Sequence, residues 1–202
     1  MTITPGPTID TDLTHTRDLL FAYYNATAEE VGHAGWASPD LLPEWCRTDH
    51  DDPADYYAHP GAYFTAHLAG RPAGGVGVHL LDPGTAEVKR LYVLPHARGH
   101  GTARALMTRL HAHARAVGAD RCVLDCLPQR TGAIALYEAL GYRPIPPYRE
   151  YTAHAPLSCF ELRLDTHRPP RPTPGTRARS AAAEADGEPD FGSTHEGRRS
   201  RP

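Results

Sequence analysis

A segment near the middle of the chain has the residue types and the spacing to bind an anion. An expected strand ends at Val93 or Leu94, and it is followed by Arg98-Gly99-His100-Gly101-Thr102-Ala103 and by an expected helix over residues 101–117. Backbone N–H groups at a helix N-terminus point at a bound anion, and the helix dipole adds about half a positive charge there. Glycine lets the backbone come close to such a ligand. The segment therefore predicts a site for a phosphorylated cofactor.

Two common phosphate-binding loops do not fit this segment. The dinucleotide fingerprint needs a third glycine where the chain has Arg104, and the Gly-Lys-Ser/Thr of a P-loop occurs nowhere in the sequence. The pattern that does fit is Arg/Gln-x-x-Gly-x-Gly/Ala, which Arg98, Gly101 and Ala103 match. In this pattern the chain resembles the GCN5-related N-acetyltransferases (GNAT), and the stretch 86–145 is similar to that family throughout.

The sequence on both sides of the loop carries the same resemblance. Glu87-Val-Lys-Arg-Leu-Tyr-Val93 is similar to the family's fourth strand, and Ala133-Ile-Ala-Leu-Tyr-Glu-Ala-Leu-Gly-Tyr142 is similar to its fourth helix and sixth strand. The resemblance implies an α/β fold with a mixed central sheet of about six or seven strands, flanked by about four helices and splayed between strands four and five. It also implies that the acetyltransferase domain covers residues 1–165.

The family resemblance implies acetyl-CoA as co-substrate and, with it, a set of cofactor-binding residues. Leu91, Tyr92 and Val93 would pair with the pantetheine arm as an added strand would, and the Val93 N–H would also be the oxyanion donor. Relatives often carry an asparagine ahead of the fourth helix, where this chain departs from the pattern and has Thr131 as the nearest equivalent. The expected contacts to the pyrophosphate come from Arg98, Gly99, His100, Gly101, Thr102 and Ala103.

Two residues are expected to move protons while the acetyl group passes from the thioester to a primary amine by direct attack in a ternary complex. Glu87 stands where some relatives carry a general base, and a raised pKa would suit that role. The alternatives are a carboxylate paired with Lys89 or Arg90, a solvated carboxylate, and a base role taken by a water chain. Tyr137 stands where the family's tyrosine protonates the leaving thiolate. Its alternative is a core aromatic, because it shares a helical face with Leu140.

The acceptor is expected to be set by the two regions that differ most between relatives, residues 30–60 and 143–157. The second region is stiffened by three prolines and presents Tyr148 and Tyr151, which suits a small-molecule pocket. The first is rich in aspartate and aromatic residues, which would attract a cationic amine, although a solvated acidic turn explains it as well. The sequence therefore predicts a small amine acceptor. It leaves open a peptide or protein amine, and a non-catalytic acyl-CoA-binding sensor.

Periodicity and turn residues predict the elements that position these groups. Thr11 or Thr14 would cap a first helix with Val31 on its buried face, and residues 33–60 would hold one or two short helices. The other expected elements are strands over Ala62–Leu68 and Ala73–Leu81 joined across residues 69–72, a strand over Arg121–Leu127, a helix over Thr131–Leu140 and a strand over Ser158–Leu164.

The composition limits the partners of the chain. Its 202 residues carry a net charge of −3, so no electrostatic argument favours nucleic acid or an acidic membrane. It has no run of about 18 apolar residues and no leader-like N-terminus, so a cytoplasmic location is expected. Residues 166–202, rich in Pro, Arg, Ala and Gly, are expected to form a disordered tail. A homodimer is left open.

Histidine and cysteine spacing does not predict a metal site or a disulfide. His111 and His113 would point to different faces of one helix, and no carboxylate or cysteine pattern accompanies the other histidines. Cys122 and Cys126 would lie ~13 Å apart along a strand, too far to bridge each other. No metal is expected, and the cysteines are expected to be small buried thiols.

Overall fold

The structure of the chain is a computed structural model that describes residues 8–149 and 157–164. The strands are β1 (Thr8–Asp10), β2 (Ala62–Leu68), β3 (Arg71–Asp82), β4 (Thr85–Val93), β5 (Arg121–Cys126), β6 (Arg143–Ile145) and β7 (Ser158–Arg163). The helices are α1 (Thr16–Glu30), α2 (Glu44–His50), α3 (Pro53–Tyr56), α4 (Thr102–Ala116) and α5 (Thr131–Ala139), with 3₁₀ turns η1 (Pro39–Leu41) and η2 (Pro95–Ala97). The expected domain boundary at residue 165, the expected tail over 166–202 and Tyr151 lie outside the described residues and stay predictions.

The seven strands form one mixed sheet in the order β1-β2-β3-β4-β5-β7-β6. Neighbouring strands are antiparallel except for β4 and β5, which run parallel. This arrangement confirms the expected α/β fold with a mixed sheet of six or seven strands. The described residues form five α-helices rather than about four, because the segment ahead of β2 contains both α2 and α3.

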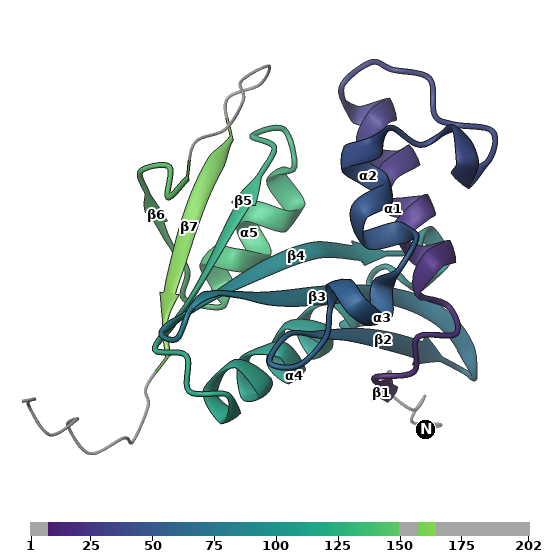
Figure 1. The fold of residues 1–202 in the computed structure, drawn as a ribbon. Coiled ribbons are helices and arrows are strands. Elements are labelled where there is room, and N and C mark those ends of the chain that lie inside the picture. Colours follow the sequence, from purple (N-terminus) through teal and green to yellow (C-terminus); the bar gives the residue numbers. More distant parts are fainter. Residues whose placement is uncertain (1–7, 150–156, 165–202) are drawn as a thin grey trace, which may run out of the picture. The chain divides into compact units, whose positions relative to one another are not determined.

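Helices cover both faces of the sheet, and each face has its own core (Figure 1). On one face α4 buries Leu106 and Leu110, which stand four residues apart and so share a helical face. The helix α5 adds Tyr137 to the same core. On the other face α1 and α2 pack Leu20 and Cys46 over β2 and β3. We call the second face, which carries α1, α2 and α3, the upper face.

Two glycines in β3 let tyrosine rings lie directly on the upper face. A Cβ atom at Gly77 would lie 2.2 Å from the ring of Tyr57, and one at Gly75 would lie 2.3 Å from the hydroxyl of Tyr63. Glycine inside a strand often marks such a close approach. Both tyrosines are buried as a result, between the strand and the helices.

The strands β4 and β5 part soon after they meet. Their ladder joins only Thr85–Glu87 to Arg121–Val123. Beyond it, Figure 1 shows β5 and β7 turning steeply away from β3 and β4. The strand β4 stays paired with β3 as far as Val93. Residues 88–93 therefore keep one edge on β3 and turn the other to a gap, which confirms the expected splay.

A β-bulge in β4 decides which side chains face upward. While β3 advances from Gly75 to Gly77, β4 covers the three steps between Tyr92 and Lys89, and Arg90 has a φ of +55°. An extra residue in one strand interrupts the alternation of side chains. The consecutive residues Lys89 and Arg90 therefore both lie on the upper face, so one strand supplies two neighbouring cations there.

The expectations for the first helix are wrong at both ends. The helix α1 begins at Thr16 after His15, which makes no side-chain capping bond. The hydroxyl of Thr14 donates instead to Asp12 at 2.6 Å, inside the turn that follows the unexpected strand β1. Val31 was expected on the buried face, but it follows the last helical residue and is 43% exposed.

The turn between β2 and β3 is shorter than the sequence predicts. It consists of Ala69 and Gly70, with φ values of +51° and +74°. Two consecutive residues with positive φ match the twist of a tight hairpin, so the ladder continues up to them. The strand β3 therefore begins at Arg71 instead of Ala73, and Pro72 lies within it.

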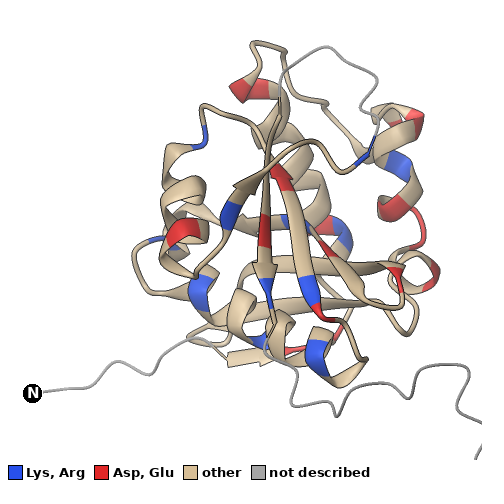
Figure 2. Ribbon diagram, turned by 90° about the vertical axis from the view of Figure 1, so that its left-hand side faces the viewer, with Lys and Arg blue, Asp and Glu red and all other residues tan. Residues whose placement is uncertain are grey.

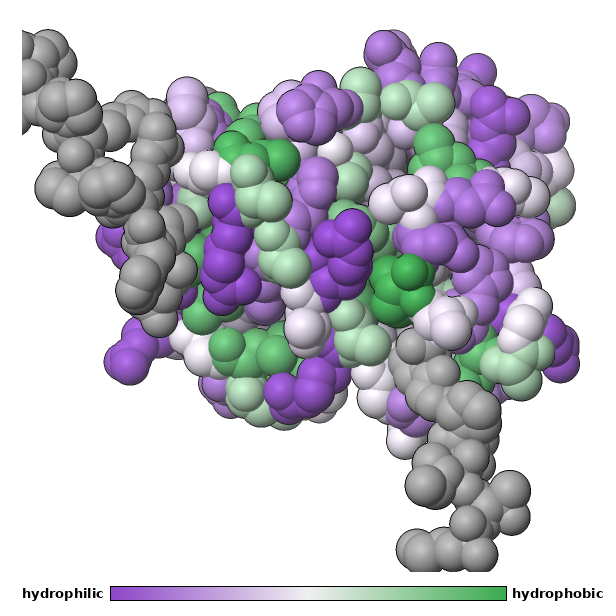
Figure 3. Space-filling model, turned by 90° about the horizontal axis from the view of Figure 1, so that it is seen from below, coloured by the Kyte–Doolittle hydropathy of each residue, from purple (hydrophilic) through white to green (hydrophobic). Residues whose placement is uncertain are grey.

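Most large apolar side chains of the described residues are buried in the protein interior. The four cysteines are buried, as expected for small apolar thiols. Figure 3 shows the side on which α4 lies, where hydrophobic residues are scattered among hydrophilic ones. Within residues 8–149 and 157–164, none of the helices has both the length and the apolar character needed to cross a membrane.

Candidate active site

A cleft of about 720 Å³ opens where β4 leaves β5. Its walls come from the end of β4, the loop before α4, the start of α5 and one side of α1. It is lined by nine of the ten expected cofactor-binding residues, namely Leu91, Tyr92, Val93, Arg98, Gly99, Gly101, Thr102, Ala103 and Thr131. The structure thus brings together residues that the sequence could place only by resemblance. Their contacts to a cofactor stay predictions.

The loop before α4 has the conformation of an anion-binding turn. Gly99 and Gly101 have φ values of +78° and +76°, a region in which glycine has no Cβ penalty. Gly101 is the N-cap of α4 and supplies no side-chain cap, so the first N–H groups of the helix are left for a ligand. The buried hydroxyl of Thr102 donates to the carbonyl of Ala97 at 3.1 Å, which fixes the loop against the helix.

The two longer side chains of the loop lie differently. Arg98 donates from Nε to the carbonyl oxygen of Val93 at 3.2 Å, so its guanidinium spans the loop and the end of β4. His100 is exposed and does not line the cleft, and its Nδ1 lies 2.8 Å from the carbonyl oxygen of Arg98. A cofactor contact by His100 would therefore have to come from its backbone N–H.

Tyr137 lies where the cleft narrows between β4 and β5. It borders a cavity of about 30 Å³ together with Leu91 and Lys89. Its ring is 6% exposed and contacts Tyr142 and Phe160, at centroid distances of 5.7 Å and 6.2 Å. Burial raises the pKa of Tyr137, so the phenol stays protonated at neutral pH. The ring therefore belongs to the core, as the alternative prediction stated, and it also borders the small cavity between β4 and β5.

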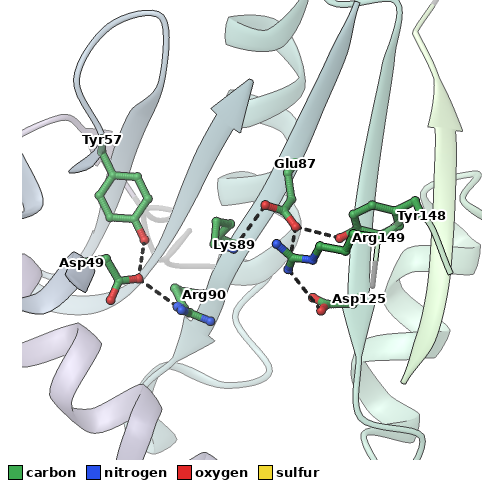
Figure 4. A network of polar contacts seen from close by, with 8 residues as sticks. All are labelled: Asp49, Tyr57, Glu87, Lys89, Arg90, Asp125, Tyr148 and Arg149. Atoms are coloured by element: carbon green, nitrogen blue, oxygen red, sulfur yellow. Dashed lines mark hydrogen bonds and ion pairs between the residues drawn. The ribbon is translucent and has the colours of Figure 1, made fainter. Parts of the chain in front are cut away.

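Glu87 is at the centre of an ion-pair network on the upper face (Figure 4). Its carboxylate accepts hydrogen bonds from the hydroxyl of Tyr148 at 2.8 Å and from Lys89 at 3.1 Å. Arg149 lies 2.8 Å from Glu87 and 3.4 Å from Asp125 of β5, so one guanidinium joins the two strands. The Glu87 side chain is only 3% exposed. The carboxylate is therefore paired and not solvated, and its role as a base stays a prediction.

Arg90 belongs to a second network, centred on Asp49 of α2 (Figure 4). The Nε of Arg90 lies 2.9 Å from Asp49, which is 1% exposed and also accepts bonds from Tyr57 at 3.1 Å and from Tyr24. Burial raises the pKa of Tyr57, and the negative charge of Asp49 adds to this. The aspartate that could have attracted a cationic acceptor is thus neutralised within the protein.

A third group, which the sequence did not indicate, closes the cleft from the side of α1. Arg130 donates to Thr27 at 2.6 Å and pairs with Glu30, and its guanidinium lies 5.4 Å from the centre of the Tyr23 ring. Arg90 faces the same ring at 5.6 Å. The only sequence signal was the cationic residue directly before the expected helix at Thr131. Its partners on α1 lie about a hundred residues away.

His79 is a second residue of the site to which no sequence pattern points. It pairs with Glu87 in the ladder of β3 and β4, so both side chains share the upper face. Its ring lies 4.2 Å from that of Tyr56, and its Nε2 is buried with no hydrogen-bond partner among the described residues. Burial lowers the pKa of His79, which keeps the imidazole neutral. Only the strand register reveals this neighbour of Glu87.

Several charged residues of the sheet form ion pairs, among them Glu87 with Lys89 and Arg121 with Glu161. Acidic and basic residues lie near one another along its strands in Figure 2. Among residues 8–149 and 157–164, no group of three or more His, Cys, Asp or Glu side chains is placed to hold a metal ion. The paired carboxylates and cations of this region are suited to proton transfer and to the binding of charged groups.

Comparison with known proteins agrees with this geometry. The acetyltransferase (GNAT) family model matches residues 31–142. An uncharacterized N-acetyltransferase of Escherichia coli is 33% identical over 117 residues, which are 56% of this chain and 70% of that protein. N-acetylaspartate synthetase of Danio rerio is 32% identical over 131 residues, and the chain spans about half of its length, 46%. A Salmonella typhimurium structure described as an acetyltransferase with its cofactor acetyl-CoA has a TM-score of 0.59 at 20% identity, covering 83% of this chain and 99% of that one.

Proposed function

The chain belongs to the acetyltransferase (GNAT) family, and from this premise we propose that it acetylates the primary amine of a small molecule with acetyl-CoA as donor. The observation that carries the proposal is the cleft, in which the unpaired edge of β4 leads to the open N-terminus of α4. A strand edge suits the amide-bearing arm of the cofactor, and a helix N-terminus suits its phosphates. The Danio rerio relative is named for an acetylated small molecule, which supports an acceptor of that kind.

The proposed reaction needs a base on one side of the splay and an acid on the other. The amine, once it has lost a proton to Glu87 directly or through water, attacks the thioester carbon, and the N–H of Val93 stabilises the oxyanion. The C–S bond then breaks, the departing thiolate takes the phenolic proton of Tyr137, and the extra proton on the new amide nitrogen passes through water to re-form the phenol. Lys89 belongs to both surroundings, since it pairs with Glu87 and borders the cavity at Tyr137. Lys89 therefore links the surroundings of the proposed base with those of the proposed acid.

The test is an assay of the full chain with acetyl-CoA and a panel of small amines and short peptides, in which the free thiol of CoA is followed. We expect thiol release with at least one small amine, and acetylated product in equal amount. Cofactor binding without thiol release across the panel would favour the acyl-CoA sensor instead. Release only with peptides would move the acceptor to a peptide or protein amine.

A cytoplasmic location, expected from the sequence, accords with a reaction that draws on acetyl-CoA, and it stays part of this proposal.

A further inference from the structure

The acceptor side of the splay carries two carboxylates and two cations that pair with one another. The carboxylates of Glu87 and Asp125 face the cations of Lys89 and Arg149, and the pairs lie between 2.8 and 3.4 Å apart. The oxygen Oε1 of Glu87 is bonded to Tyr148 and Arg149, and Oε2 is bonded to Lys89. These three partners cover the carboxylate, whose side chain is only 3% exposed, so an acceptor amine cannot reach it past all of them. One of these partners must therefore move when an acceptor binds.

Of the two cations, Arg149 has the lower cost of displacement. Its side chain is 38% exposed, whereas that of Lys89 is 9% exposed. Lys89 is also fixed by the ladder of β3 and β4, while Arg149 lies beyond the end of β6. A cation at the surface can be hydrated when it leaves its partner, but a buried one cannot. The acceptor ammonium would thus take the place of the Arg149 guanidinium at Glu87.

The chemistry of that exchange selects the acceptor. A plain amine would add one positive charge beside two cations and separate Arg149 from a carboxylate 2.8 Å away. An amine that also carries a carboxylate would insert between the two, with its ammonium on Glu87 and its carboxylate on Arg149. One ion pair then becomes two, and the balance of charge is kept. The planar guanidinium suits a carboxylate because it can donate two parallel hydrogen bonds.

We propose that the acceptor is a zwitterionic amino acid, and that Arg149 binds its carboxylate while Glu87 receives its ammonium. Asp125 assists, because it holds Arg149 from the side of β5 while the contact to Glu87 opens. This inference rests on the proposed N-acetyltransferase function and adds the chemical class of the acceptor. It also assigns Arg149 a substrate-binding role that the motifs of the sequence did not indicate.

The test compares each of a set of amino acids with its own carboxamide and its decarboxylated amine, all with acetyl-CoA and the full chain. We expect the best amino acid to exceed its carboxamide by about tenfold or more in kcat/KM, as for loss of one partner of a charge pair. Arg149→Gln should lower kcat/KM for the amino acid by a similar factor, mainly through KM, and change the carboxamide by less than about threefold. Arg149→Lys should restore part of the preference for the amino acid over its carboxamide, since lysine keeps the positive charge but lacks the two parallel N–H donors of the guanidinium.

The controls separate this proposal from the one on which it rests. Acetyl-CoA affinity should be the same in wild type and Arg149→Gln, because Arg149 does not line the cofactor cleft. Equal or better turnover of the carboxamide or the plain amine by wild type overturns the zwitterion and leaves the N-acetyltransferase standing. A preference that survives in Arg149→Gln overturns the role of Arg149. Absence of thiol release with every amine, while acetyl-CoA binds, overturns the proposed function itself.

Discussion

The proposed cofactor-binding part of the site (the donor half) and the proposed amine-binding part (the acceptor half) consist of different kinds of groups. The donor half consists of two runs of consecutive residues, 91–93 and 97–104, with the start of α5. The groups proposed to bind the cofactor there are mainly backbone N–H and C=O. The acceptor half consists of side chains from α2, β4, β5 and the segment after β6, joined in the networks of Asp49 and Glu87. Backbone sites depend on local conformation, which adjacent residues determine. Side-chain networks depend on how distant segments pack.

This difference predicts opposite ways to break the two halves. The donor half should lose cofactor affinity when a side chain is added, because the groups proposed to bind the cofactor are exposed backbone N–H and C=O groups. The acceptor half should fail when a side chain is removed, because each charge there neutralises another.

The largest effect is expected from Asp49→Asn. It leaves the guanidinium of Arg90 without its carboxylate, and loss of one partner of a buried pair costs about 3 kcal/mol of unfolding free energy. Urea unfolding measures this, with Asp51→Asn as the control. Asp51 pairs with Arg47 at 2.8 Å in an exposed setting, where a pair is worth at most about 1 kcal/mol. Equal losses in the two variants would mean that the network around Asp49 adds nothing to stability.

The next effect is expected from Gly101→Glu. The new carboxylate would stand at the N-cap of α4, where the cofactor phosphates are proposed to bind, and repel them. We expect acetyl-CoA affinity to fall by about hundredfold or more, measured by titration calorimetry, as for several lost charge-assisted hydrogen bonds.

Gly70→Glu is the matched control for this substitution. Gly70 and Gly101 have φ values of +74° and +76°, and a Cβ would meet nothing within 4 Å at either. Backbone strain is thus the same in both variants, but Gly70 lies in the hairpin turn, away from the cleft. If both variants lose the cofactor, strain and not the phosphate loop is responsible.

The smallest effect is expected from Tyr137→Phe, which removes a proton donor and keeps the ring in the core. Turnover should fall by about tenfold to hundredfold, as for loss of general acid catalysis, while acetyl-CoA affinity stays the same. Tyr142→Phe is the control, because Tyr142 contacts the same ring but bonds to His111 instead of bordering the opening. Steady-state kinetics with acetyl-CoA gives both numbers. Unchanged turnover in Tyr137→Phe would return Tyr137 to a purely structural role.

The same difference explains what the sequence could predict. The strand before the loop, the loop itself and the helix after it could be predicted because they follow one another in the chain, and the family resemblance supplied the positions on β4 and Thr131. The cleft brings all but His100 of the expected cofactor-binding residues together. The pairing of Glu87 with Lys89 was among the alternatives, since the two residues stand two apart on one strand.

The rest of the acceptor half could not be read from the sequence, for physical reasons. The pairing of Asp49 with Arg90 joins residues that stand 41 positions apart. It also needs the β-bulge at Arg90, which no residue pattern in the sequence predicts. The contact of Glu87 with Tyr148 spans 61 residues and needs the final packing of the sheet. An isolated aspartate in a polar segment looks the same in sequence whether it is solvated or buried against an arginine.

The unpaired edge of β4 has a consequence for the stability of the protein. A cofactor that occupies this edge binds the folded chain and has no such edge to bind in the unfolded one. Binding at a hundred times the dissociation constant adds about 2.7 kcal/mol to the free energy of unfolding. Acetyl-CoA bound as proposed would therefore stabilise the folded chain, and the midpoint of thermal unfolding should rise with its concentration.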